Sequence, residues 1–247
     1  MAKELRLDKY LSEMNLGTRS QIKEAAKKGR IQVNGAAARK TDIKINPDTD
    51  KVTFDGKTVS YQKYEYYMLH KPAGVVSATQ DNLYPTVIGL LGSKIRKDLF
   101  PVGRLDIDTE GLLLITNDGE LAHRLLSPRK HVDKVYYAVV EGTLPQDSKE
   151  RFALGITLTD GTPVKPAKLE ILKQERGESH ILLTIHEGKF HQVKRMFEAL
   201  DCRVTYLKRM SMGSLELDES LAPGSFRPLT GEEIRELKEL TNYDDEE

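Results

Sequence analysis

The sequence predicts an α+β fold, and three observations support this. Apolar residues recur at helical spacing over residues 5–14 and again in the segment after Thr18. Apolar and polar residues then alternate over 135–140, 167–172 and 180–185, a pattern typical of half-buried strands. A chain of 247 residues is long enough for two domains. We therefore expect a small, helix-rich N-terminal domain and a larger domain organised around a sheet.

The N-terminal segment predicts two helices followed by a β-hairpin. Thr18 is a candidate N-cap for the second helix, which we expect to end near Gly29. A short strand at 31–33 leads into Asn34-Gly35, a strong signal for a tight hairpin turn. We expect residues 46–64 to form a turn and a linker. The first helix would bury a face made of four residues, namely Leu7, Tyr10, Leu11 and Met14.

The second of these helices carries a row of cations. Arg19, Lys23 and Lys27 recur every four residues and share a face. Like charges at this spacing slightly destabilise a free helix. RNA phosphates would supply the partners that the row lacks, whereas ordinary solvation is the plain alternative. We expect RNA binding, with Lys28 and Arg30 extending the basic surface.

The segment most informative about function is GRLDIDTEGLLLITNDG, residues 103–119. Asp106 stands between Arg104-Leu105 and a short polar turn at 108–110. The apolar run at 112–115, closed by a turn, predicts a buried strand. Polar residues on a loop before a buried strand are well placed for a functional site. On local chemistry alone, Asp106 could equally cap a turn.

Two later segments add candidate residues. Lys134-x-Tyr136 opens the predicted strand at 135–140, and there Tyr136 and Tyr137 point to opposite faces, so the register decides which one lines a site. Residues 187–200 predict a helix with Lys194 and Arg195 on its first turn. The plain alternatives are a core tyrosine and a solvated basic face.

Together these motifs resemble the S4-domain ribosomal RNA pseudouridine synthases, the RsuA-like family. RLDKYLSEMNLGTRSQIKEAAKKGRIQVNG is similar to an S4 domain, and GRLDIDTEG to the synthase signature. The resemblance covers nearly the whole chain. It implies an S4 RNA-binding domain of the α-L type in 1–60, a hinge near residue 60, and a catalytic domain in 61–240. That domain would have the pseudouridine synthase fold, a mixed, mainly antiparallel sheet flanked by helices, followed by an acidic tail at 241–247.

The resemblance also implies roles for individual residues. Asp106 would be the catalytic nucleophile, and Arg104 would enter the space left by a flipped-out base. Tyr136 would stack on the extruded uracil and help to move a proton. Lys194, in preference to Arg195, would pair with Asp106 and keep it ionised. The KPxG stretch of residues 71–74 would pack beside the site, with Lys71 as a supporting residue. The expected RNA contacts are Arg19, Lys23, Lys27, Lys28, Arg30, Lys189 and Arg195.

Charge and composition exclude several other classes of protein. The net charge of zero conceals +5 in residues 1–60, +3 in 61–215 and −8 in 216–247. A basic body with an acidic C-terminal segment is compatible with RNA binding. No apolar stretch approaches 18 residues and no signal-peptide core is present, so we expect a cytoplasmic protein that is not in a membrane. The lone Cys202 excludes an internal disulfide and a zinc knuckle.

The reaction that the resemblance implies is the isomerisation of uridine to pseudouridine. It breaks a C–N glycosidic bond and rejoins the base through carbon 5, without a redox partner, metal or ATP. In agreement, the sequence contains no P-loop, Gly-rich dinucleotide motif or HExxH. We expect no cofactor and no metal. Whether Asp106 attacks the base, attacks the sugar or removes a sugar proton is open, as is the exact target uridine.

The substrate expectation depends on Phe190 and His191. Within EGKFHQVKRMF they resemble the synthases of small-subunit 16S rRNA, whereas the large-subunit branch more often has Asn-Arg there. We expect a monomer that acts on ribosomal RNA in a small-subunit assembly intermediate. Three alternatives stay open: a 23S rRNA synthase, a non-catalytic RNA-binding or ribosome-assembly protein, and a glycosidase using two of the carboxylates at 106–110. The absence of tryptophan argues against the glycosidase.

Overall fold

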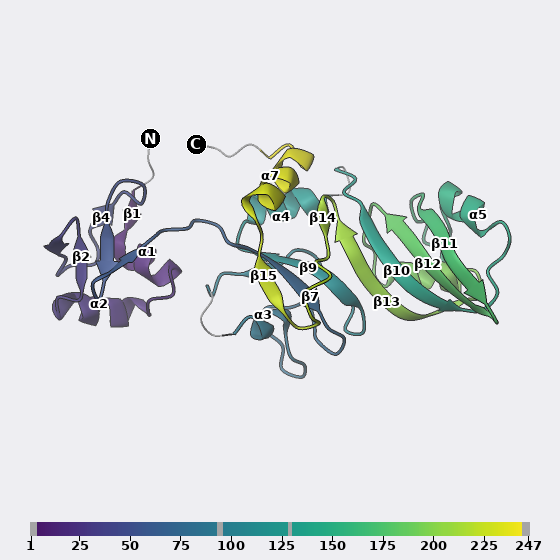
Figure 1. Cartoon of the computed structure of the whole chain (residues 1–247), viewed down its shortest axis with the longest axis horizontal. Helices are drawn as coiled ribbons and strands as arrows, with labels where there is room; N and C mark the ends of the chain where they lie inside the picture. The colour runs from purple at the N-terminus through teal and green to yellow at the C-terminus, as the bar shows by residue number, and fades with distance from the viewer. Residues whose placement is uncertain (1–3, 93–95, 128–129, 244–247) are drawn as a thin grey trace. The chain divides into compact units, whose positions relative to one another are not determined.

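The computed structural model describes residues 4–92, 96–127 and 130–243 (Figure 1). It divides into two compact units. Among these residues, the first unit comprises 4–65, 92 and 96–99, and the second comprises 66–91, 100–127 and 130–243. Of the expected acidic tail, residues 244–247 lie outside the described residues.

The first unit packs two helices, α1 (Leu7–Glu13) and α2 (Arg19–Lys27), against short strands. Thr18 caps α2 as predicted, because its side chain accepts from Gln21 N and the Gln21 side chain accepts from Thr18 N. The predicted Asn34-Gly35 turn is confirmed by positive φ at both residues. A four-stranded sheet in the order β3-β2-β5-β6 lies beside a separate pair, β1·β4. The strands are β1 (Leu5–Arg6), β2 (Ile31–Val33), β3 (Ala36–Ala37), β4 (Lys44–Ile45), β5 (Val52–Phe54) and β6 (Lys57–Val59).

The expectation that residues 46–64 form only a turn and a linker is wrong, because β5 and β6 make a hairpin there. Its turn is Asp55-Gly56, and both residues have positive φ. Asp-Gly is a hairpin signal, but the polar residues around it favoured a linker. Val52 is fully buried in the core of this unit. Tyr10 ties the helices to the hairpin by donating from its hydroxyl to Val59 O at 2.7 Å. These strands therefore belong to the folded core.

The second unit is built on a nine-stranded sheet in the order β11-β12-β10-β13-β9-β7-β15, with β14 paired to β13 and β8 to β9. All the pairings are antiparallel except β9·β13, so the sheet is mixed and mainly antiparallel, as expected. The strands predicted at 112–115, 135–140, 167–172 and 180–185 are all present. Their bounds are β7 (Tyr66–Lys71), β8 (Phe100–Pro101), β9 (Glu110–Thr116), β10 (Lys134–Glu141), β11 (Lys168–Glu175), β12 (Glu178–Ile185), β13 (Arg203–Met212), β14 (Leu215–Glu216) and β15 (Phe226–Pro228).

Five helices accompany this sheet in the described part of the chain. Figure 1 shows α7 beside α4 near β14 and β15, and α5 next to β11. Arg124 of α4 donates to Asn242 O at 2.6 Å, which holds the end of α7 against α4. No described helix is long and apolar enough to cross a membrane. The helices are α3 (Val87–Leu90), α4 (Gly119–Leu126), α5 (Ser148–Leu154), α6 (Gln192–Glu198) and α7 (Gly231–Leu240).

The parallel pair β9·β13 requires a glycine at its contact point. Gly111 faces Arg209 in the register and has a φ of +104°. A Cβ at this position would lie 2.2 Å from the carbonyl oxygen of Arg209, which is far inside van der Waals contact. The buried guanidinium of Arg209 then donates to Leu112 O at 2.7 Å. Glycine thus allows the strand that follows the Asp106 loop to join the centre of the sheet.

Candidate active site

Asp106 lies on the loop between β8 and β9, and its backbone is fixed on both sides. Ser77 bonds Leu105 twice, accepting from its N–H at 3.0 Å and donating to its carbonyl at 2.9 Å. Gly74 N donates to Ile107 O at 2.7 Å. The loop is therefore tied to the chain that follows β7, and the Asp106 carboxylate stays one-quarter exposed.

Lys71 binds the backbone of this loop from the protein interior. Its side chain, at the end of β7, is fully buried. The ammonium donates to the carbonyls of Asp106 at 2.9 Å, Ile107 at 3.2 Å and Thr109 at 2.7 Å, and also to Pro72 O. Burial lowers the pKa of Lys71 to about 8, although the carboxylates of the loop act in the opposite direction. One buried cation thus binds three carbonyl groups of the loop backbone.

Lys194 brings a positive charge to the exposed side of the loop. Its Nζ lies 3.2 Å from Asp106 Oδ2 and 2.6 Å from Asp108 Oδ1. Burial opposes the charged ammonium, but the hydrogen bond to Asp108 and the charge of Asp106 outweigh it and raise the pKa of Lys194. Burial likewise opposes the charged form of Asp108, yet the hydrogen bond from Lys194 lowers its pKa. Of the two predicted candidates, Lys194 is the one placed beside Asp106, while Arg195 pairs with Asp160 at 2.5 Å.

His191 contacts the other oxygen of the same carboxylate. Its Nε2 lies 3.6 Å from Asp106 Oδ1, and its backbone is left-handed, with a φ of 48°, at the N-cap of α6. From the sequence, His191 was expected only to distinguish the type of RNA, and Asp108 was not expected as a partner of Lys194. Both residues stand near predicted ones in the chain, but only the packing of α6 against the loop brings them together.

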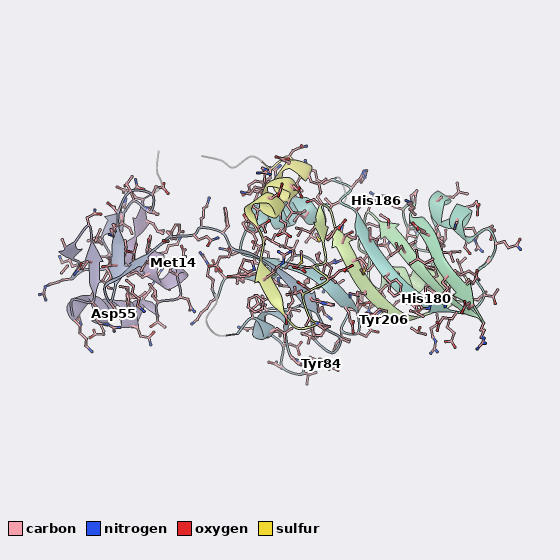
Figure 2. The ribbon with its side chains drawn as sticks, viewed as in Figure 1. Met14, Asp55, Tyr84, His180, His186 and Tyr206 are labelled. Atoms are coloured by element: carbon pink, nitrogen blue, oxygen red, sulfur yellow. The ribbon has the colours of Figure 1, made fainter. Side chains whose placement is uncertain are left out.

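The register of β10 decides between the two tyrosines. Tyr136 belongs to the buried face and lines a small cavity of about 70 Å³ together with Arg104 and Asp106. Tyr137 points to the opposite face, where its ring lies between His180 and Tyr206, both labelled in Figure 2. Its hydroxyl is bonded to His180 Nδ1. The structure therefore places Tyr136, and not Tyr137, beside Asp106.

A larger cleft of about 610 Å³ opens next to this cavity. Three residues line both spaces: Arg104, which is exposed, the partly exposed Asp106, and Lys189. Lys134 lines the cleft too, with its ammonium donating to Val132 O at 2.7 Å. Burial, followed by the charge of Arg209, lowers the pKa of Lys134 to about 8. The cleft thus combines three cations with the partly exposed carboxylate of Asp106, which suits a phosphate-bearing ligand.

The expected RNA-contacting residues outside the cleft differ in their availability. Lys27 has an acidic partner after all, since Glu24 lies 2.7 Å away one turn earlier on α2. The expectation that no acid accompanies this row is therefore wrong. Arg30 pairs with Asp55 at 2.5 Å. A hollow of about 340 Å³ on the same unit is bordered by Lys28 and Arg30. The exposed members of the row also include Arg19 and Lys23.

Other chemistries find less support in this arrangement. In the part of the chain that the structure describes, no three His, Cys, Asp or Glu side chains are grouped to hold a metal ion. Cys202 is buried, and burial together with the charge of Asp201 raises the pKa of its thiol. Asp106 and Asp108 share one ammonium instead of facing each other across a cleft.

Comparisons with known proteins agree with this arrangement. The family described as RNA pseudouridylate synthase matches residues 65–199, and the S4 domain matches residues 5–50. An uncharacterized RNA pseudouridine synthase of Bacillus subtilis is 45% identical, covering 95% of this chain and 99% of its own. The ribosomal small subunit pseudouridine synthase A of Escherichia coli K12 is 40% identical, covering 93% and 98%. A crystal structure of a pseudouridylate synthase aligns with a TM-score of 0.66 at 39% identity, over 94% of this chain and 99% of that one.

Proposed function

Because the chain belongs to the RNA pseudouridylate synthase family, we propose that it converts uridine to pseudouridine in small-subunit 16S ribosomal RNA. The observation that carries the proposal is the setting of Asp106, which lies at the wall of a cationic cleft with Lys194 at 3.2 Å. The small-subunit assignment is supported by relatives at 40–41% identity that are named ribosomal small subunit pseudouridine synthase A. Their names concern those proteins, and this chain matches nearly their full length.

In this proposal each side chain of the site has a separate task. Asp106 acts as the covalent nucleophile, since a carboxylate can fill that role when it is ionised. Lys194 places a positive charge beside this carboxylate, at 3.2 Å. Tyr136 stacks on the extruded uracil and helps to move a proton, because it borders the small cavity with Asp106. Arg104 occupies the space that the flipped base leaves.

The N-terminal unit would hold the RNA while the second unit modifies it. We propose an S4 domain in residues 1–60, a catalytic domain in 61–240 and a tail in 241–247. The matches to an S4 domain and to the synthase family fall within the first two segments. A monomer acting in the cytoplasm on an assembly intermediate completes the proposal.

The test is tritium release from 5-tritiated uridine, because the hydrogen at carbon 5 leaves when the base is rejoined there. Small-subunit transcripts and precursor particles are incubated with wild-type protein and with Asp106→Asn. We expect release by the wild type alone, with RNA binding retained by both. Release by Asp106→Asn would contradict the catalytic assignment. Release only from large-subunit RNA would identify a 23S enzyme, and none from either RNA would favour a binding protein.

A further inference from the structure

Phe190 presents an exposed aromatic ring at the rim of the cleft. Its side chain is 73% exposed. One face of the ring lies on the imidazole of His191, with centroids 3.8 Å apart and planes inclined by 20°. Because the imidazole covers that face, the exposed area belongs to the opposite face and the ring edges. A single exposed apolar residue is common on protein surfaces, so the surroundings of Phe190 decide whether it has a task.

The backbone that carries this ring is constrained on both sides. Gln192 accepts from Lys189 N at 2.8 Å and donates to Glu187 Oε1 at 3.1 Å, which staples the segment before Phe190. His191 then takes its left-handed conformation, which is uncommon for a residue other than glycine. The backbone that carries the ring is therefore ordered before any ligand arrives, which reduces the entropy lost on binding.

The chemistry around the ring matches nucleic acid. Phe190 lines the 610 Å³ cleft together with the cations Arg104, Lys134 and Lys189. Cations of this kind attract phosphates, and a flat aromatic face stacks on unpaired bases. The supporting imidazole lies 3.6 Å from Asp106, so a base stacked on Phe190 would be adjacent to the reacting nucleotide.

Phe190 and Tyr136 border different spaces. Tyr136 lines the small cavity beside Asp106, whereas Phe190 borders only the larger cleft. We infer that Phe190, backed by His191, is a stacking platform for the unpaired base next to the target uridine. The occupant is thus a neighbouring nucleobase of the RNA, and Phe190 contributes to the choice of sequence around the target. This inference rests on the proposed function.

The experiment measures RNA affinity and turnover separately. Affinity is measured by fluorescence anisotropy in the Asp106→Asn background, with a labelled 16S fragment that carries the uridine modified by the wild type. Phe190→Ala should raise Kd about five- to hundredfold, the range expected for loss of one base stack. In the active background KM should rise with it, while kcat changes little. Phe190→Tyr should retain affinity, and Phe190→Leu should recover only part of it.

Two controls separate stacking from general damage. Leu154→Ala removes another strongly exposed apolar side chain, at the end of α5, and should change neither Kd nor KM. RNA fragments with one abasic nucleotide on either side of the target complete the comparison. On the fragment that lacks the contacted base, the Asp106→Asn protein should bind with the same Kd whether it carries Phe190 or Phe190→Ala.

The outcomes that would overturn the inference are specific. One is an unchanged Kd for Phe190→Ala, and another is an equal loss on every abasic fragment. A third is a dimer of the wild type that becomes a monomer in Phe190→Ala, as measured by light scattering. That result would mean that a second copy of the chain covers Phe190. If the wild type released no tritium, the proposed function would fail. The anisotropy comparison, run with 16S precursor fragments, would still report on Phe190 by itself.

Discussion

The ammonium of Lys194 lies 3.2 Å from the carboxylate of Asp106, although α6 and the β8–β9 loop come from distant parts of the chain. The same ammonium is bonded to Asp108 at 2.6 Å. One cation therefore serves two carboxylates, and these three side chains carry a net charge of −1 when all are ionised. A nucleophilic carboxylate must be ionised, and a neighbouring cation favours the ionised form.

Lys194→Met should lower kcat about 100-fold, a loss comparable with removal of one electrostatic contact in an active site. Lys194→Arg, which keeps the charge, should restore part of the rate. Lys173→Met, on an exposed ion pair of β11, serves as the control. An unchanged kcat in Lys194→Met would remove the ion pair from the mechanism.

Lys71→Met should reduce kcat by about 100-fold or more while leaving RNA affinity nearly intact. The substitution releases the loop carbonyls that Lys71 binds, and small displacements of a reacting group have effects of this size. Buried carbonyls without partners should also lower the free energy of unfolding by about 1–3 kcal/mol. Single-turnover rates, RNA binding and denaturant unfolding would be measured together. A large loss of stability with normal turnover would assign Lys71 to folding alone.

Alkaline pH should slow the wild-type enzyme. The pKa of Lys71 is lowered to about 8, so above that pH the native protein holds a neutral amine with fewer donors for the loop. The effect of this residue on the free energy of unfolding has the opposite direction. Between pH 8 and the usual lysine range near 10.5 the unfolded chain binds more protons, so this residue makes stability rise with pH. Lys134 has a similar pKa, and Lys134→Met is the check: the rate should still fall above pH 8 in that variant.

The basic row on α2 should account for part of the salt dependence of RNA binding. Replacing Arg19, Lys23 and Lys27 together by Ala should weaken binding and flatten the plot of log K against log salt by about two to three phosphate contacts. Because Glu24 already pairs with Lys27, we expect Lys27 to contribute least of the three. Glu24→Gln should accordingly steepen the plot. An unchanged slope in the triple variant would exclude this surface as an RNA contact.

Gly111→Ala should disrupt the centre of the catalytic unit. A Cβ there would collide with the backbone of Arg209, and the φ of +104° disfavours any side chain. We expect a loss of about 2–5 kcal/mol of stability, seen as a Tm lower by about 5–15 °C. Gly119→Ala is a matched control, because a Cβ at the start of α4 meets nothing within 4 Å. An unchanged Tm for Gly111→Ala would mean that β9 and β13 can move apart without cost.

Much of the local structure could be predicted from the sequence. Thr18 before a helix, Asn34-Gly35 between strands and the alternation in 135–140 all produced the expected elements. These signals are local: a cap, a turn or a two-residue period depends on neighbours in the chain. The missed hairpin at Asp55-Gly56 had the same kind of signal, but polar residues around it favoured a linker.

The sequence by itself determined many of the local elements and singled out Asp106 by its motif. Only the tertiary structure decided that Tyr136 faces Asp106 while Tyr137 binds His180, that Lys71 holds the loop from below, and that Lys194 is shared with Asp108. The physical reason is distance along the chain. Contacts between remote segments depend on strand order and register, which are set by packing of the whole sheet and not by any short pattern.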